Sequence, residues 1–323
     1  MSHASYLTRT GICTTDLAAH PTDPLLAADV LFSKIAAAGY TTVQFGFSTV
    51  TDTRYTADGQ IEFPDCTDLL ADGTTEKLRA AAQNHGIEIS ATNGTFNMAH
   101  PDPQVRAEAI RRFDSFLAAS RSLGASIVSL CSGTRCTRHL WTYDLENRTD
   151  DAWRDMLDSM CRCTELAERR NVILAVETEA SNVISTPEDA RRLLDTVGSE
   201  HLKMILDPAN LFLPGTAHPE NVRRTLRHAF DLFGDDIVLA HGKDIRAGDG
   251  IDFCATGEGI VDYPYLAALL SEIGFTGDMM LHGIYDAEKF APATRLTRHS
   301  HKVVWRQLPT WKWITSTSTY RIQ

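Results

Sequence analysis

The sequence has 323 residues, of which 43% are hydrophobic and 23% charged, and its formal net charge is −11. This composition is ordinary for a soluble globular protein, and the length suits one large domain better than two. The acidic balance argues against a dominant role in binding nucleic acid or a membrane surface. A small anionic substrate remains compatible with it, because one local Arg or Lys can hold such a group.

Neither the cysteines nor the N-terminus indicates secretion. The seven cysteines are odd in number and contain no C-x-x-C pair, so we expect reduced thiols rather than a zinc ribbon or redox dithiol. Residues 1–10 lack the apolar core of a signal peptide, and no run of 18 apolar residues could span a membrane. We therefore expect a cytoplasmic protein, and the oligomeric state stays open between a monomer and a homo-oligomer.

Short apolar runs alternate with helical patterns along most of the chain. Strands are expected over Leu7–Cys13, Thr41–Phe45, Ile87–Ala91, Ser126–Leu130, Val172–Val176, Leu202–Leu206, Ile237–Ala240 and Asp278–Leu281. Helices are expected over Pro24–Ala38, Thr74–His85, Pro103–Leu123, Asp151–Arg170, Pro219–Phe233 and Tyr263–Ile273, with one more beginning at Ser185–Glu188. Eight strands that alternate with helices predict an α/β protein of the (β/α)8 TIM-barrel class. No Gly-x-Gly-x-x-Gly follows the first strand, which weakens the alternative of a Rossmann fold.

The barrel is assigned to one domain that covers most of the chain. Residues 1–290 are interpreted as a single (β/α)8 domain, and residues 291–323 as the last helix and a C-terminal tail. The long connection Gly46–Asp72 is expected to lie over the barrel mouth, and Gly242–Gly259 is expected to be a long polar loop. Asp262 is expected to cap the helix that follows the second of them.

Acidic or imidazole side chains directly follow four of the expected strands. These residues are Glu177, Asp207, His241 and His282. Because the C-terminal ends of barrel strands meet at one rim, we expect the four side chains to share a site. Two carboxylates crowded there need a cation, and oxygen plus imidazole ligands suit Mn, Mg, Zn or Co. The structural alternative is that the acids are exposed loop residues and that His241 only packs.

Further polar residues after the strands are candidate substrate ligands. Arg135, in a Ser-Gly-Thr-Arg turn, can hold a phosphate or carboxylate bidentately, or it can form a rim salt bridge. Asn97, Glu179 and Lys243 are placed where they could contact substrate hydroxyls. Gly257-Glu-Gly259 could present backbone amides to an anion, although such a short pattern is a weak signal.

Four segments of the chain carry a family resemblance. They read VETEASNVISTPEDARRLLDTVGSEHLKMILDPANLF, LAHGKDI, GEGIVDYPYLAALLSEIGFTG and NGTFNMAHPD. Over residues 7–290 the chain resembles the sugar phosphate isomerase/epimerase family of xylose isomerase-like barrels. Members of that superfamily include ketose epimerases, inosose dehydratases and apurinic endonucleases.

The resemblance implies a divalent metal held by Glu, Asp, His and Glu at four strand ends. Glu177, Asp207 and His241 match the first three positions in order, whereas His282 stands in place of the last Glu. Asn210 stands where many epimerases have a His, three residues after the metal Asp, and we take it as a substrate-binding candidate. In the epimerases the first and last Glu are thought to act as opposing bases. His282 would then serve as a metal ligand or as an acid/base group.

These observations predict a metal-dependent isomerase or epimerase of carbohydrate metabolism. It would act on a small sugar, sugar phosphate or related polyol-ketone through an enediolate, with Glu177 and His282 as the catalytic residues. The alternatives are a metal-dependent dehydratase or lyase on the same scaffold, and a barrel that binds sugar without turnover. DNA repair is disfavoured by the acidic charge and by missing ligands for a trinuclear zinc site, so neither a nucleic-acid nor a membrane partner is expected.

Overall fold

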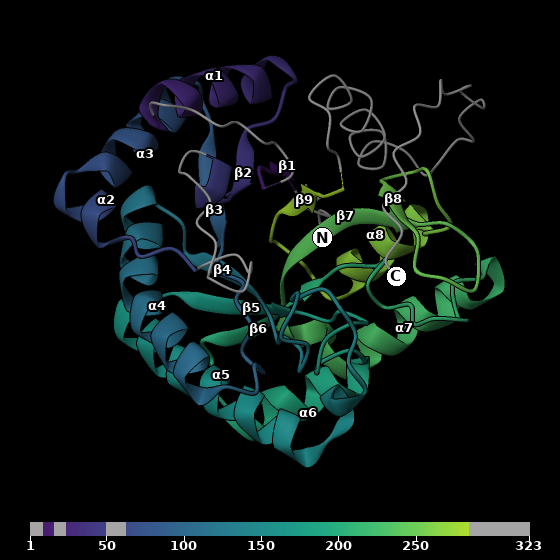
Figure 1. Cartoon of the computed structure of the whole chain (residues 1–323). Coiled ribbons are helices and arrows are strands. Elements are labelled where there is room, and N and C mark those ends of the chain that lie inside the picture. The colour runs from purple at the N-terminus through teal and green to yellow at the C-terminus, as the bar shows by residue number, and fades with distance from the viewer. Residues whose placement is uncertain (1–8, 16–23, 50–62, 284–323) are drawn as a thin grey trace.

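A computed structural model describes residues 9–15, 24–49 and 63–283, in which eight parallel strands form a closed barrel (Figure 1). The barrel strands are β1 (Thr10–Cys13), β2 (Thr42–Phe45), β3 (Glu88–Asn93), β4 (Ile127–Cys131), β5 (Ile173–Glu177), β6 (Leu202–Leu206), β7 (Ile237–Ile245) and β9 (Met279–Leu281). Closure comes from β1, which pairs in parallel with both β2 and β9. The predicted (β/α)8 fold is confirmed.

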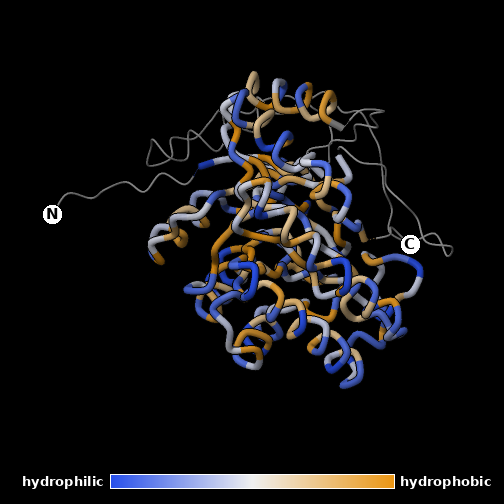
Figure 2. Tube along the Cα trace, turned by 90° about the vertical axis from the view of Figure 1, so that its left-hand side faces the viewer, coloured by the Kyte–Doolittle hydropathy of each residue, from blue (hydrophilic) through white to orange (hydrophobic). Residues whose placement is uncertain are grey.

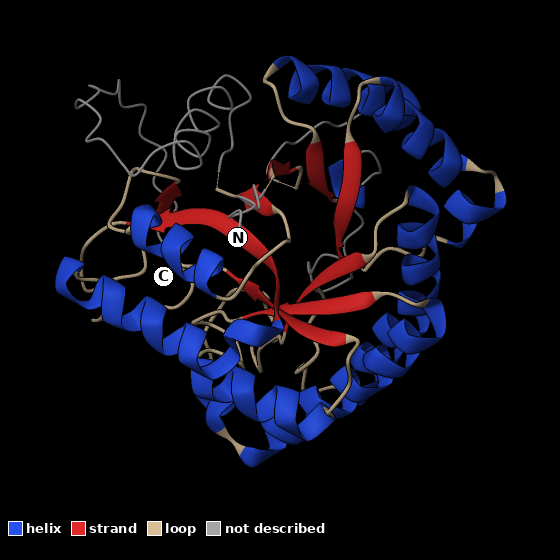
Figure 3. Cartoon of the chain, turned by 180° about the vertical axis from the view of Figure 1, so that it is seen from behind, coloured by secondary structure: helices blue, strands red, loops and turns tan. Residues whose placement is uncertain are grey.

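Helices surround the strands on the outside of the barrel, as Figure 3 shows from the opposite side. The α-helices are α1 (Pro24–Ala37), α2 (Thr67–Ala71), α3 (Thr74–Asn84), α4 (Pro103–Leu123), α5 (Asp150–Arg170), α6 (Pro187–Val197), α7 (Val222–Phe233) and α8 (Tyr263–Glu272). Short 3-10 helices cover η1 (Phe47–Thr49), η2 (Leu145–Arg148), η3 (Pro219–Asn221) and η4 (Gly234–Asp236). Most of these bounds lie within a few residues of the predicted ones.

Local capping chemistry explains why the helix ends agree so well with the sequence. Thr186 and Asp189 form a reciprocal capping box at the start of α6, where Pro187 occupies the first turn. The Asp262 carboxylate accepts a hydrogen bond from the Tyr265 backbone N–H at 3.0 Å, so its predicted cap of α8 is confirmed. Gly124 ends α4 with a φ of 99°, a conformation that favours glycine.

The main core lies between the strands and the helices. It is built from buried aliphatic and aromatic side chains, among them the stacked pair Phe113 and Phe116, whose ring centroids are 6.0 Å apart. A smaller apolar cluster fills the inside of the barrel. Figure 2 shows many hydrophobic residues in the interior, while the outer helices alternate between hydrophilic and hydrophobic residues. Burial of both faces of the strands is the usual state of a parallel sheet.

The connection after the seventh barrel strand differs from the prediction. β7 continues through His241 to Ile245 and pairs antiparallel with β8 (Phe253–Ala255), so much of the expected loop Gly242–Gly259 is a hairpin. The hairpin forms because backbone groups of β7 beyond the barrel rim find partners in β8 instead of solvent. In the other long connection, the described residues include η1 and α2, and residues 50–62 lie outside the described part.

Several predictions concern parts of the chain that are not described. The predicted domain boundary at residues 290 and 291, the last helix and the tail all lie outside the described residues, as do the first two residues of the first predicted strand. Within the described residues, no helix combines the length and the apolar character that crossing a membrane requires.

Candidate metal and substrate site

The candidate site lies one layer above the apolar cluster inside the barrel. That cluster includes Ala175, Ile205, Leu239 and Met280. Successive strand residues point to opposite faces, so a side chain two positions further along the same strand also points inward. Two positions after those four residues stand Glu177, Asp207, His241 and His282. The apolar layer therefore forms the floor of a polar layer at the C-terminal end of the barrel.

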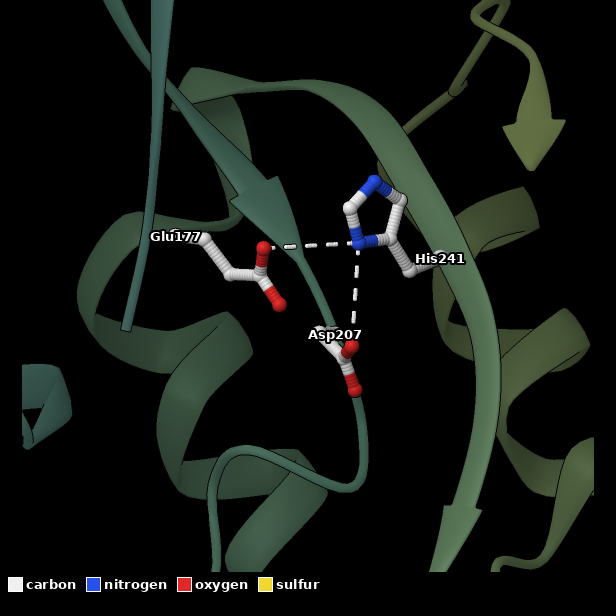
Figure 4. A group of neighbouring side chains, drawn as sticks. All are labelled: Glu177, Asp207 and His241. Carbon is white, nitrogen blue, oxygen red and sulfur yellow. Dashed lines mark ion pairs between the residues drawn. The ribbon is translucent and has the colours of Figure 1, made fainter. Parts of the chain in front are cut away.

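Glu177, Asp207 and His241, hereafter the three-residue cluster, point toward one another (Figure 4). His241 Nδ1 lies 3.5 Å from Glu177 Oε2 and 3.6 Å from Asp207 Oδ2. One ligand-type atom from each residue lies within 4.8 Å of the other two, and all three residues are buried. The prediction that these three side chains lie together is confirmed by this geometry.

Two atoms of the cluster are buried without a hydrogen bond. Among the described residues, neither Asp207 Oδ2 nor His241 Nδ1 has a hydrogen-bond partner. Leaving buried polar atoms unsatisfied is costly, and such atoms in a native structure call for an explanation. Two carboxylate oxygens and an imidazole nitrogen that face a common point are a donor set suited to a divalent cation. The residues therefore fit the metal that the sequence predicted.

Burial and mutual attraction shift the pKa values of all three residues in the cluster. Burial raises the pKa of Glu177. Burial would also raise the pKa of Asp207, but Lys243 and His241 together hold it below its usual range. Burial alone would lower the pKa of His241, whereas the attraction of the two carboxylates outweighs it and raises that pKa. A proton on His241 and a divalent cation would thus compete for the same place.

A glutamine that the sequence analysis did not single out fixes the ring of His241. His241 Nε2 donates a hydrogen bond to Gln44 Oε1 at 2.9 Å, and Gln44 Nε2 donates to Ser129 Oγ at 3.0 Å. Because Nε2 carries the hydrogen of this bond, Nδ1 is the nitrogen left to face the carboxylates. The only signal in the sequence was a polar residue inside each of two apolar strands, β2 and β4.

Replacing Gln44 by Leu should weaken the binding of Mn²⁺ or Zn²⁺ by about 10–100-fold, the usual effect of losing a partner of a metal ligand. The apolar side chain would leave His241 Nε2–H without its acceptor, so that the ring is no longer held. Equilibrium dialysis with elemental analysis measures this change. Gln104→Leu, a glutamine in α4 that lines the same cavity, is the matched control and should retain wild-type affinity. An unchanged dissociation constant in Gln44→Leu would remove Gln44 from this role.

His282 lies beside the three-residue cluster rather than within it. Its ring stacks on that of His241 with the centroids 5.4 Å apart and the planes inclined by 6°. The backbone N–H of His282 donates to Gly242 O at 3.0 Å, which fixes the start of this segment beside β7. The side chain lines the cavity described below. Its predicted parts as a fourth ligand and as an acid/base residue stay predictions.

The other predicted substrate ligands divide into two groups. Asn97, Glu179, Asn210 and Lys243 all line the cavity above the cluster, and Lys243 Nζ donates to Asn210 Oδ1 at 2.7 Å. Arg135 does not line that cavity. The structure therefore brings four of the five residues to one place, and their predicted contact with substrate stays a prediction.

Arg135 contributes instead to a clamp on the loop after β3. Its Nη1 donates to Asp155 Oδ2 at 2.6 Å and to Ala99 O at 3.1 Å. Arg106 donates to the other Asp155 oxygen at 3.1 Å and also to the backbone carbonyls of His100 and Pro101. Both guanidinium groups thus hold the loop through its carbonyl oxygens, and one carboxylate holds both guanidinium groups. The predicted contact of Arg135 with an anionic substrate group would require that it leave this clamp.

The glycines before α8 surround an anion that the protein itself supplies. The Asp244 carboxylate is fully buried and accepts hydrogen bonds from the backbone N–H groups of Ile245 at 2.9 Å, and of Gly257 and Val261 at 3.0 Å each. A Cβ at Gly259 would lie 2.3 Å from Asp244 Oδ1, so only glycine permits this approach. The expectation that Gly257 and Gly259 serve an external anion is wrong, because Asp244 already fills the place.

A cavity of about 1960 Å³ opens above the cluster. Its floor includes the polar layer, and its walls include aromatic side chains from several exit loops, among them Phe47, Phe96, Trp141, Tyr143 and Phe253. An apolar wall with a few convergent polar groups is the usual form of a small-molecule site, and the C-terminal mouth of the barrel is its usual place.

Several solved structures are similar to this one over most of their length. A D-psicose 3-epimerase from Clostridium cellulolyticum H10, solved with D-tagatose, superposes with a TM-score of 0.66 at 15% identity, covering 91% of this chain and 100% of that one. The IolI protein with a bound zinc atom gives 0.64 at 18% identity, covering 91% and 97%. The probable 3-DHS dehydratase AsbF from Bacillus anthracis gives 0.65 at 13% identity, covering 90% and 98%. Among curated proteins, no significant sequence match is found.

These structural similarities, at such low identity, establish the shared fold alone. The sequence itself also matches the xylose isomerase-like TIM barrel family over residues 32–307, which is most of the chain. The family expected from the sequence segments is therefore confirmed. The protein belongs to the xylose isomerase-like TIM barrel family.

Proposed function

We propose that the protein is a divalent-metal-dependent isomerase or epimerase that acts on a small sugar, sugar phosphate or related polyol-ketone. The observation that carries the proposal is the three-residue cluster, whose buried donor atoms face one another at the floor of the cavity. Epimerases and a zinc-binding protein among the similar structures support the same class of chemistry.

Glu177, Asp207 and His241 would hold the cation. When bound, it supplies a Lewis-acid charge that stabilises the oxyanion of an enediolate as a proton leaves the adjacent carbon. Zn, Mn, Co and Mg all accept such a donor set, with the imidazole favouring the first three over Mg.

The side chains of the chain would move the proton and hold the substrate. Burial raises the pKa of Glu177, which makes its carboxylate a better proton acceptor than an exposed one. His282 lines the same cavity and would exchange a proton from another direction. The amide of Asn97 and the carboxylate of Glu179 offer the acceptors and donors that substrate hydroxyls require.

A dehydratase is the second candidate, and His282 is the observation that favours it. A carboxylate and an imidazole in one cavity suit removal of the α-proton by the first and protonation of a departing hydroxyl by the second. The similarity to the probable dehydratase AsbF supports this reading. Both candidates share the first proton transfer, so one experiment can separate them.

Exchange of substrate protons with solvent tests the proposal. We expect the Mn²⁺- or Zn²⁺-loaded protein to introduce deuterium from D2O next to the carbonyl of at least one compound in a panel of ketoses and cyclic polyhydroxy ketones. An isomeric product detected by NMR would identify an isomerase or epimerase. An unsaturated ketone detected by its ultraviolet absorbance would identify a dehydratase.

Glu177→Gln is the variant that ties the exchange to the site, and it should abolish deuterium incorporation. Glu272→Gln, an exposed acid paired with Arg227 on the outer surface, is the control and should leave incorporation unchanged. A metal-loaded protein that binds a panel sugar without exchange or elimination would contradict the enzymatic proposal and indicate a sugar-binding barrel.

A further inference from the structure

A lysine is buried directly beside the three-residue cluster. Lys243 follows His241 by two positions in β7, so both side chains point into the barrel. Its side chain is only 8% exposed, and its Nζ lies 3.8 Å from Asp207 Oδ2 and 3.6 Å from the centroid of the Phe253 ring. Burying an ammonium group is costly unless it is paired and hydrogen-bonded. The contacts that compensate for this cost therefore indicate the role of the lysine in the site.

The lysine connects to Glu177 through one intervening side chain. Lys243 Nζ donates to Asn210 Oδ1 at 2.7 Å, and Asn210 Nδ2 donates to Glu177 Oε1. An ammonium group can only donate, so it fixes the amide with its oxygen toward Lys243 and its nitrogen toward Glu177. The backbone N–H of Asn210 donates to Asp207 Oδ1 at 3.2 Å, which anchors the same residue to the second acid.

These bonds assign different tasks to the two oxygens of Glu177. Oε1 is held by the Asn210 amide, while Oε2 faces His241 Nδ1 at 3.5 Å, inside the cluster. Without the amide, the carboxylate could rotate or withdraw from the neighbouring Asp207 carboxylate, because two like charges in a buried site repel each other. The lysine fixes the amide, and the amide fixes the carboxylate.

We propose that Lys243 and Asn210 form a positioning pair that directs Glu177 Oε2 toward the bound cation, a role distinct from their predicted contact with substrate. The inference rests on the proposed function, because it requires that the three-residue cluster hold a divalent ion. Lys243 acts on Glu177 through Asn210, so its effect on the position of Glu177 requires the asparagine.

The charge of the lysine also affects metal affinity directly, and this effect is opposite in sign to the effect of positioning Glu177. The two effects must therefore be separated. Removing a positive charge close to Asp207 should by itself strengthen the binding of a dication. Losing the hold on Glu177 should weaken that binding. Asn210 is neutral, so its replacement neither adds nor removes a charge near Asp207. A double-mutant cycle between the two residues therefore isolates the part of the lysine's effect that passes through the asparagine.

The experiment measures the dissociation constants of Mn²⁺ and Zn²⁺ for wild type, Asn210→Leu, Lys243→Met and the double variant. We expect Asn210→Leu to weaken binding by about 10–100-fold, as for the loss of a ligand's hydrogen-bond partner. We also compare how much Lys243→Met changes the dissociation constant in each background. The ratio of the constants with and without Lys243→Met should be at least about tenfold higher in the wild-type background than in the Asn210→Leu background. The reason is that only the wild-type background retains the amide that the lysine orients.

Two further variants guard the interpretation. Asn210→Ala repeats the cycle without added bulk if Asn210→Leu fails to fold. Lys203→Met replaces a β6 lysine that pairs with Glu200 at 3.0 Å and Asp236 at 3.1 Å, and it should leave both dissociation constants unchanged.

The outcomes separate this inference from the proposed function. If wild type binds neither ion, the proposed function fails and the inference falls with it. If wild type binds but Lys243→Met changes affinity by the same factor in both backgrounds, or Asn210→Leu has no effect, the positioning role alone is overturned.

Discussion

Replacing Asp207 by Asn should weaken divalent-cation binding by more than about 100-fold. This loss is larger than the one expected when a residue that only hydrogen-bonds to a metal ligand is replaced. Asp207 Oδ1 accepts hydrogen bonds from the backbone N–H groups of Ala209 at 2.9 Å and Asn210 at 3.2 Å, while Oδ2 faces His241. Asparagine keeps the first oxygen and replaces the second with an amide nitrogen. That nitrogen is a donor and cannot bind a cation, so the loop is retained and the ligand is lost.

Competition with a chelating indicator would measure this loss for Mn²⁺ and Zn²⁺. Because a ligand that binds only the native state stabilises it, added metal should raise the melting temperature of wild type and not of the variant. Glu179→Gln is the matched control: Glu179 is also a buried acid and lines the same cavity, but it lies outside the three-residue cluster. Wild-type affinity in Asp207→Asn would refute the assignment of the metal site.

Replacing His282 by Gln should reduce turnover by about 10²–10⁴-fold, the range for loss of a general acid or base, and leave the metal content unchanged. The expectation follows from its place: the ring stacks on His241 and lines the cavity without joining the three-residue cluster. Glutamine retains hydrogen bonding but cannot exchange a proton near neutral pH. One limb of the pH dependence of kcat should therefore disappear.

A second variant separates this role from metal binding. If His282 is a ligand, His282→Glu should shift the preference from Zn or Co toward Mg or Mn, because carboxylate oxygen suits the latter ions. His139→Gln, an imidazole of the same cavity on the loop after β4, is the control and should keep the wild-type pH profile. Unchanged metal preference and pH profile in both His282 variants would exclude it from the reaction.

The sequence by itself determined the barrel and the location of the cluster. Strand patterns and helix caps are local: the Thr186 capping box and the Asp262 cap depend on residues within one helical turn. Glu177 and Asp207 also directly follow apolar strands, so the sequence places both at strand ends. Closure of eight parallel strands then brings these positions to one rim.

Only the tertiary structure decided which polar groups pair with one another. Gln44 contacts His241 across 197 residues of sequence, and Asn210 links Glu177 to Lys243 across 33 residues on either side. No periodicity in a sequence specifies such pairs, because they depend on the register between strands and on side-chain rotamers.

The same reason explains why residue type alone left alternatives open. Arg135 suits an anionic ligand or a salt bridge, and in the structure Asp155, twenty residues away in α5, pairs with it. The glycines near Gly257 have the pattern of an anion site, and a buried carboxylate of the protein fills it. The type of a residue determines which groups it can bind, whereas the packing of the fold determines which of those groups lies next to it.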